Sequence, residues 1–417
     1  MIELVAEHGY NAVSVATLAS RARVSKRDFY KRCGGKEECF LATYDVIVSQ
    51  SLRGILAATE GERDWRERLR LGFLAFAGQI AGSPEAAQLA LVDAFAAGAV
   101  AVERMQRANR LYETVVADFA LADEGPQLPG LVVKGIVAGC GRVARARLLS
   151  GHPRQLVLDG DEVMEWALSF CDDDAVRLRG LTIAGVPPVP ATGAEAPFGA
   201  AGDERALILA ATARLASREG YATLTGPRVR AAAGVSRRSF DTHFEGVSDC
   251  FLATLETLSR RTLAAAEPSF LTADSWASGI HRMIASLCQR LAHDPGFASL
   301  AFLEVFSPDP EVIQWRSEMI AKLAAGLRRG APPAQRPTVF AAEASVGAMW
   351  GVIHHFVATG RGAQLPSAAP MLSYIALAPA LGGPAAIAAI VADAAENGAS
   401  GAAGLAAPAA SRPPVSK

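Results

Sequence analysis

The residues best suited to chemistry form a dense basic cluster near the start of the chain. Seven cations and one acid, Asp28, give sixteen residues a local net charge of +6, whereas all 417 residues together carry only −1. Positive charge gathered in this way suits the phosphate groups of a nucleic acid, and the balanced total means that it must lie on one face. The seven cations are Arg21, Arg23, Lys26, Arg27, Lys31, Arg32 and Lys36.

Two short helices are predicted to carry this cluster. Ser14 is a good N-cap, and Leu18 lies on the inward face of the helix that follows it. After a short turn, Ser25 can cap a second helix whose first exposed turn carries Lys26 and Arg27. A helix, a tight turn and a second helix with such side chains are typical of recognition in the DNA major groove. The alternative is a solvated basic hairpin in an unrelated all-α protein.

The same pattern returns 211 residues later. Residues 39–43 recur unchanged as residues 250–254. Further along, the register slips by a residue or two, so that residues 147–151 lie opposite residues 356–360. One nearly constant register over such a length predicts the duplication of a whole domain. Matching pairs include Gly9 and Gly220, Trp65 and Trp276, and Pro84 and Pro295.

Two stretches, residues 1–45 and 204–256, carry a family pattern. In the first it comprises Gly9, Tyr10, Ser14, Leu18, Ala19, Val24, Ser25, Phe29, Tyr30 and Lys36, and in the second Gly220, Tyr221, Thr225, Ala233, Gly234, Val235, Ser236, Phe240 and Phe244. With these residues the sequence resembles the TetR/AcrR family of repressors. The resemblance implies that each copy continues into a helical domain. The last two long helices of that domain would form a four-helix dimer interface, and its middle helices would enclose a mostly apolar effector pocket.

The resemblance also implies roles for the matching polar residues. Tyr30 and Lys36 are expected to contact phosphates, and Lys26 and Arg27 are expected to read base edges. Asp28 either accepts a hydrogen bond from a cytosine amine or only caps its helix. The remaining DNA-binding candidates are Ser14, Thr17, Ser25 and Lys31 in the first copy and Thr225, Arg228, Ser236, Arg237, Arg238 and His243 in the second.

The second copy departs from the pattern where phosphate contacts are expected. Asp241 stands opposite Tyr30, Val247 stands opposite Lys36, and residues 228–247 have a net charge of only +2. We therefore expect the first copy to supply most of the affinity for the DNA backbone, with the second weaker or reading a different half-site. The alternative is a small-molecule sensor in which only the first copy binds DNA and the second is a structural lobe.

The first copy departs from the pattern in two ways. Cys33 stands where the second copy has Phe244, which predicts a slightly looser three-helix core. Residues 203–211 of the second copy have no counterpart in the first. We expect either that the protein starts upstream of Met1 or that the first helix is truncated, and without these residues the first domain is expected to be less stable.

Helical periodicity predicts an all-α fold of two consecutive modules, each a three-helix DNA-binding domain followed by a helical ligand and dimerisation domain. An apolar run over residues 371–392 is long enough to span a membrane, but the prolines and glycines at its centre predict two buried helices joined by a turn. The predicted boundaries are 1–46 and 47–180 for the first module, 181–202 for a linker, 203–257 and 258–393 for the second module, and 394–417 for a disordered tail.

The predicted function is that of a ligand-responsive transcriptional repressor in the cytoplasm. Its partners would be a double-stranded DNA operator with two half-sites and a small apolar effector. The two halves would pair within one chain as a pseudo-dimer, and a homodimer of four modules is the alternative. The expected pocket residues are Trp65, Phe73, Trp276 and His354.

Other chemistries find little support in the sequence. Six cysteines lie scattered without a C-x-x-C pair, which does not favour disulfides or a zinc site. The adjacent His354 and His355 would point about 100° apart on a helix, so they could not bind one metal ion together and we expect no metal site. We also expect no cofactor. The chain lacks the common nucleotide-binding and hydrolase motifs, and an all-α enzyme with a buried active site is the least favoured alternative.

Overall fold

A computed structural model describes residues 1–121, 125–171, 175, 178, 198–200, 202–306 and 309–404, and within these ranges all regular structure is helical, as predicted. The first half contains α1 (Ile2–Ala12), α2 (Val15–Arg21), α3 (Lys26–Tyr30), α4 (Lys36–Ala58), α5 (Trp65–Gly82), α6 (Pro84–Leu91), η1 (Asp93–Ala97), α7 (Ala99–Ala120), α8 (Gly130–Leu149), α9 (Gln155–Leu158) and α10 (Gly160–Leu168). The second half contains α11 (Glu204–Glu219), η3 (Tyr221–Thr223), α12 (Gly226–Ala233), α13 (Arg237–His243), α14 (Val247–Leu271), α15 (Trp276–His293), α16 (Pro295–Phe302), η4 (Glu304–Phe306), α17 (Pro310–Arg329), η5 (Pro333–Gln335), α18 (Val339–Ala358), η6 (Gly362–Gln364), α19 (Leu365–Leu381) and α20 (Gly383–Gly404).

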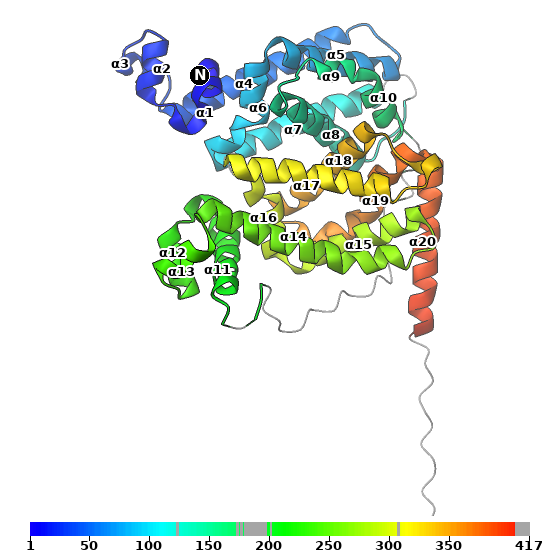
Figure 1. The fold of residues 1–417 in the computed structure, drawn as a ribbon. Coiled ribbons are helices and arrows are strands. Elements are labelled where there is room, and N and C mark those ends of the chain that lie inside the picture. Colours follow the sequence, from blue (N-terminus) through cyan, green and yellow to red (C-terminus); the bar gives the residue numbers. More distant parts are fainter. Residues whose placement is uncertain are drawn as a thin grey trace, which may run out of the picture.

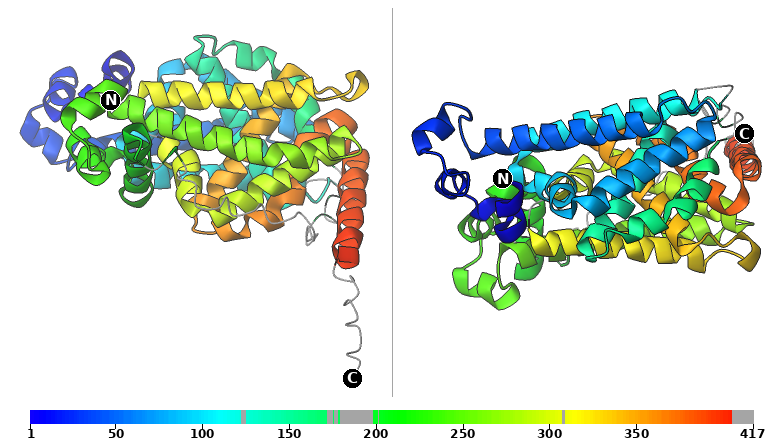
Figure 2. Two further views of the ribbon diagram at one scale, coloured as in Figure 1. Left: turned by 60° about the horizontal axis from the view of Figure 1, so that its bottom comes forward. Right: turned by 90° about the horizontal axis from the view of Figure 1, so that it is seen from above.

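The two N-terminal three-helix units lie at the same end of the molecule. Figure 1 shows α1–α3 and α11–α13 both on the left, with the remaining helices stacked to their right and α20 at the opposite end. The two further views in Figure 2 keep both units at that shared end. The long helices α4 and α14 lead from these units into the body of the molecule.

The backbone repeats where the sequence predicts a repeat. Gly9 and Gly220 both have positive φ, 74° and 87°, and nearly equal ψ, 154° and 151°. Gly151 and Gly360, which follow α8 and α18, have φ of 74° and 70°. A left-handed residue directly after a helix lets the next N–H bond back to its last turn, and glycine takes this conformation without strain.

Helices α8 and α18 pack closely enough that glycine is required along their contact. A Cβ atom added at Gly139 would lie 2.9 Å from the carbonyl oxygen of Ala344, and one added at Gly351 would lie 2.3 Å from the Cβ of Ala138. Gly347 makes an equally close approach to the stem of Arg142. Glycines four residues apart lie on one face of a helix, so each helix offers the other a flat surface.

Buried side chains fasten the same contact from both halves. The indole Nε1 of Trp166, in α10, donates to Ser345 Oγ in α18 over 2.9 Å. Phe170 stacks edge-on against Trp166 on one side and Tyr374 of α19 on the other, with ring centroids 5.2 and 6.0 Å apart. The two halves therefore share one hydrophobic core, which contains residues of both.

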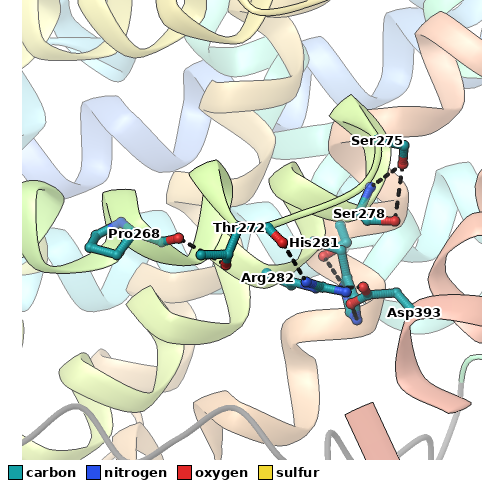
Figure 3. A network of polar contacts seen from close by, with 8 residues as sticks. Pro268, Thr272, Ser275, Ser278, His281, Arg282 and Asp393 are labelled. Atoms are coloured by element: carbon teal, nitrogen blue, oxygen red, sulfur yellow. Dashed lines mark hydrogen bonds and ion pairs between the residues drawn. The ribbon is translucent and has the colours of Figure 1, made fainter. Parts of the chain in front are cut away.

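A buried grouping of Ser373, His281 and Asp393 ties α20 to the core of the second half, and Figure 3 shows His281 and Asp393 with Arg282 beside them. Ser373 Oγ lies 2.8 Å from Nδ1 of His281, and Nε2 of His281 lies 3.9 Å from Asp393, which also accepts a 2.6 Å bond from Arg282. The Ser373 hydroxyl donates to the carbonyl of Ala369, and Ser373, His281 and Asp393 are at most 1% exposed. A hydroxyl committed to a backbone carbonyl and closed off from solvent serves packing, not nucleophilic attack.

The C-terminal helices agree with one prediction made from the sequence and contradict another. The apolar run forms α19 and α20, joined at Gly382 with φ of 79°, and no described helix has the length and hydropathy of a membrane span. The disordered tail was predicted from residue 394, but α20 continues through Gly404 because its Ala-rich sequence favours a helix. Residues 405–417 and almost all of the predicted linker lie outside the described residues.

Replacing Gly139 with Ala should destabilise the protein by about 1–3 kcal/mol, because the added methyl would overlap Trp166 and the Ala344 carbonyl. Gly141 lies on the same helix with no atom within 4 Å of an added Cβ, so Gly141→Ala should be neutral or stabilising by up to about 1 kcal/mol. Urea unfolding of the two variants measures the difference. Equal effects would show that the close helix contact is absent.

Acid should weaken the fold through His281. Burial, together with the charge of Arg282, lowers the pKa of His281 to about 4, so between pH 6.5 and 4 the unfolded chain binds a proton that the folded chain rejects. Unfolding free energy should therefore fall as pH drops, by about 2 kcal/mol more between pH 7 and 5 in the native protein than in His281→Asn. Urea unfolding at both pH values measures this, with the exposed His152→Asn as control. Equal pH dependence of the unfolding free energy in all three proteins would show that folding does not lower the pKa of His281.

Candidate nucleic-acid interface and adjoining cavity

Helix α3, the predicted recognition helix of the first unit, is stabilised by its N-cap. Ser25 Oγ accepts from the backbone N–H of Asp28 over 3.0 Å, as expected for a cap. The Asp28 carboxylate accepts from the Ser25 hydroxyl at 2.7 Å and from Lys31 at 2.9 Å, and these bonds lower its pKa. The structure thus shows Asp28 in the capping role; whether it also accepts from a base remains a prediction.

Lys26 and Arg27 are exposed on the first turn of α3, whose inner side is anchored by the buried Phe29. Within the described part of the chain, neither cation has an ion-pair partner. Tyr30, at the end of the helix, is 54% exposed. These three side chains are available to a duplex at the outer end of the molecule.

Two predicted cations are instead held within the unit. The guanidinium of Arg21 pairs with Glu7 at 2.7 Å and Glu3 at 2.9 Å, and both carboxylates raise its pKa. Lys36 Nζ donates to the backbone carbonyl of Tyr10 over 3.1 Å and lies 4.2 Å from the centre of its ring. The field at the surface is therefore weaker than the sequence count of +6, because α1 supplies acids that lie outside the counted segment.

Ser14 and Thr17 form a reciprocal capping box at the start of α2. Thr17 N–H donates to Ser14 Oγ at 3.1 Å, and Ser14 N–H donates to Thr17 Oγ1 at 3.0 Å. Both residues are exposed, so each hydroxyl lies at the surface while it stabilises the helix end.

The second unit has the same framework with fewer available charges. Ser236 caps α13 by accepting from Ser239 N–H at 3.0 Å, and Arg237 and Arg238 are exposed beside it. Arg237 lies 3.4 Å from Asp241, the acid that replaces Tyr30. Arg228 pairs with Glu219 and donates to the carbonyl of Thr223, whereas Thr225 and His243 are exposed.

The second unit is also fastened to the body of its half. The Tyr221 hydroxyl donates to Asp309 over 2.7 Å, and its backbone N–H donates to Glu304 over 2.6 Å. At the 211-residue shift, Gly98 stands opposite Asp309 and cannot offer a carboxylate. The first unit therefore lacks one side-chain anchor that the second possesses.

A cavity of about 1000 Å3 lies beside α4 in the first half. Its walls combine aromatic rings with charged groups, including an ion pair of Lys134 and Glu113 at 2.7 Å. The lining residues include Tyr44, Ser51 and Ile55 of α4, Phe73 and Phe76 of α5, Tyr112 and Phe119 of α7, Arg142 and Arg145 of α8, Arg316 of α17, and Trp350 and His354 of α18.

Two of the four residues predicted for a pocket line this cavity. Phe73 and His354 do so, and His354 Nδ1 donates to the carbonyl of Phe302 over 2.6 Å. Trp65 and Trp276 are buried but do not line it, although Trp65 packs in a cluster with Ile55 and Phe119, which do. No group of three potential metal ligands occurs in the described ranges.

Sequence reasoning missed the cationic wall of the cavity. Arg142 and Arg145 are three residues apart on α8, which places both on one face of that helix. That spacing could have been noticed from the sequence, but the approach of Arg316 from the other half could not.

Comparison with known proteins agrees with the two recognition units. Residues 2–43 and 208–254 match the model described as bacterial regulatory proteins, tetR family. The HTH-type transcriptional activator FasR of Mycolicibacterium smegmatis is 25% identical over 170 residues, which is 40% of this chain and 76% of that protein. A solved structure of the fatty acid degradation regulator FadR from Bacillus halodurans is 17% identical with a TM-score of 0.38, and the match covers 43% of this chain and 96% of that one.

The turn between α2 and α3, with its counterpart between α12 and α13, yields a stability prediction. Arg23 has φ of 55°, the one positive value outside glycine among the described residues, and Gly234 takes the equivalent position with φ of 71°. Arg23→Gly should therefore stabilise the protein by about 1 kcal/mol, because it relieves left-handed strain.

The reciprocal change supplies the control. Gly234→Ala meets no atom within 4 Å and should destabilise by about 1 kcal/mol through backbone strain alone. Thermal melting of both variants measures these effects, and shifts of the same sign would contradict the shared turn geometry.

Proposed function

We propose that this chain, with two helix-turn-helix domains of the tetR family type, is a transcriptional regulator that binds double-stranded DNA as a single-chain pseudo-dimer. The observation that carries the proposal is the shared end of the molecule at which both recognition helices present exposed cations, Lys26 and Arg27 on one and Arg237 and Arg238 on the other. Two such helices at one end of the molecule suit an operator with two half-sites.

The two half-sites need not be equivalent. In the first unit, Lys26 and Arg27 form no ion pair among the described residues, whereas in the second Arg237 faces Asp241 and Arg228 is paired with Glu219. We therefore propose that the first unit contributes more of the salt-dependent affinity and that the operator is an imperfect palindrome.

The cavity is proposed to hold a small effector. Helix α4 joins the recognition unit to the body and supplies Tyr44, Ser51 and Ile55 to the cavity wall. A ligand that favours one position of α4 would change the spacing of the recognition helices, and would release DNA if that position misfits the groove. The proposed regulator is thus a repressor relieved by its effector, and a reporter gene measures the sign of the response.

A second candidate function rests on the weaker charge of the second unit. Asp241 and Val247 replace a hydroxyl and a cation expected near phosphate, which fits a sensor in which α11–α13 serve only as a structural lobe. Footprinting separates the two functions, because a pseudo-dimer protects two half-sites and a sensor with one working unit protects one.

Paired alanine variants test the proposal directly. Lys26→Ala/Arg27→Ala should weaken operator binding by about 2–4 kcal/mol and should reduce the slope of log affinity against log salt concentration by about 1–2. Arg237→Ala/Arg238→Ala should lower both the affinity and this slope by smaller amounts. Binding is measured by fluorescence anisotropy across a salt titration, with the operator taken from the DNA upstream of the chain's own gene.

A charge-matched control removes two exposed cations of α17, Lys322→Ala/Arg329→Ala, which should leave binding almost unchanged. Equal losses and equal salt slopes in the two recognition variants would overturn the asymmetry. Losses no larger than those of the control would overturn DNA binding through these helices.

A further inference from the structure

Two cysteines of the first recognition unit lie at the two ends of one short loop. Cys33 follows α3, and Cys39 lies in the first turn of α4, where its backbone N–H donates to the carbonyl of Gly35 over 3.1 Å. The N–H of Gly34 donates to the carboxylate of Glu38. The residue after Cys33 is therefore bonded to the residue before Cys39, and the loop is folded back onto α4.

This loop brings the two thiols together. Both side chains pack against the same apolar core of the first unit. Burial raises the pKa of the Cys39 thiol, and Cys33 raises it further by charge and by a hydrogen bond between the two side chains. Thiols that share a hydrogen bond are neighbours, which is the first requirement for a disulfide.

The second unit contains the same folded loop. The N–H of Glu245 donates to the carboxylate of Asp249 over 3.0 Å, which repeats the bond of the first unit at the 211-residue shift. The loop is thus a property of the shared framework and does not depend on which residues precede and follow it.

The side chains at the two ends of the loop differ between the units. Phe244 occupies the position of Cys33. Cys250, the counterpart of Cys39, is 0% exposed, and its sulfur lies 3.0 Å from the hydroxyl of Thr212. The first unit therefore has a second thiol where the second unit has an aromatic ring of its core, and only the first unit has a dithiol.

Small molecules can reach both thiols. Cys33 and Cys39 are half-buried, and both line the cavity beside α4. Cys140 of α8 lines the same cavity from another side. Accessible cysteines with a second thiol beside them are the ones that oxidants convert to disulfides, whereas fully buried cysteines are inert.

We propose that Cys33 and Cys39 form a site of oxidative modification, at which a hydroperoxide converts the two thiols into an intrachain disulfide. The sequence spacing of the cysteines did not favour disulfides, but the folded loop supplies the proximity that spacing alone does not show. The disulfide joins the segment after α3 to the first turn of α4, so oxidation restricts the movement of α3 against α4. The chemistry does not depend on whether the chain binds DNA.

Two steps account for the oxidation. The Cys33 sulfur attacks the outer oxygen of the hydroperoxide, the O–O bond breaks, and Cys33 becomes a sulfenic acid while the peroxide leaves as an alcohol, or as water from hydrogen peroxide. The Cys39 sulfur then attacks the Cys33 sulfur, the S–S bond forms, and the hydroxide leaves with the thiol proton as water. Together the thiols lose two electrons, which the peroxide gains. Cys39 acts second because its raised pKa disfavours the thiolate.

Peptide mapping of the full chain tests the linkage. The reduced protein is treated with hydrogen peroxide, the peroxide is removed with catalase, remaining thiols are alkylated with iodoacetamide, and trypsin digestion follows without reductant. Trypsin separates residues 33–36 from residues 37–53, so the disulfide joins these two peptides into one species. We expect this species in the mass spectrum of the oxidised protein and its loss after reduction.

Serine variants test the role of each thiol. Cys39→Ser should abolish the linked species and leave Cys33 as a sulfenic acid, which dimedone traps. Cys33→Ser should also abolish it, and Cys39 should then be recovered mainly in alkylated form. Cys140→Ser removes another thiol of the cavity wall and should leave the yield of the linked species unchanged. Circular dichroism establishes that each variant is folded, and mapping of the native protein remains decisive if one is not.

Each result supports or overturns the site. The linked peptides in the native protein and in Cys140→Ser, with dimedone on Cys33 in Cys39→Ser, support it. Recovery of both cysteines as alkylated thiols after peroxide treatment overturns it, as does a disulfide from either of them to Cys140. Dimedone labelling of Cys39 in Cys33→Ser that equals the labelling of Cys33 in Cys39→Ser overturns the order of the two steps. None of these measurements contains DNA, so a failure here is distinct from a failure of the proposed function.

Discussion

The close crossing of α8 and α18 is the constraint on which the rest of the molecule depends. Gly139 and Gly351 allow the backbones to approach to distances that a methyl group would prevent. That approach places both recognition units at one end of the molecule, with α20 at the other (Figure 1). It also lets α17 of one half reach α8 of the other, so Arg316 meets Arg142 and Arg145. The proposed function therefore depends on this contact.

The two halves share a plan but differ where they would touch partners. The second unit is anchored through Tyr221, Glu304 and Asp309, and its cations are partly paired with acids. The first unit lacks the carboxylate of Asp309, and Lys26 and Arg27 on α3 form no ion pair with any residue that the structure describes. If the cavity holds an effector as proposed, the less anchored first unit is the one that its binding would most readily move.

Local features were predictable from the sequence, and contacts between distant segments were not. Ser14 and Ser25 cap the helices that they were expected to cap, because capping depends on neighbours a few residues away. The local charge was overestimated, since Glu3 and Glu7 reach Arg21 only in the folded unit. The cavity was not predictable in detail, because it is the space that side chains leave unfilled; Gly72 lines it where the second half has Met283.

The joining of both halves in one chain has a consequence for their assembly. Partners that meet through a surface such as that of α8 and α18 normally separate on dilution, and a regulator present in few copies per cell would then be partly dissociated. Here the second half remains at a high effective concentration set by the intervening segment, so association is independent of how much protein is made. Duplication within one chain also lets a single arginine change without its counterpart, a freedom that identical subunits do not have.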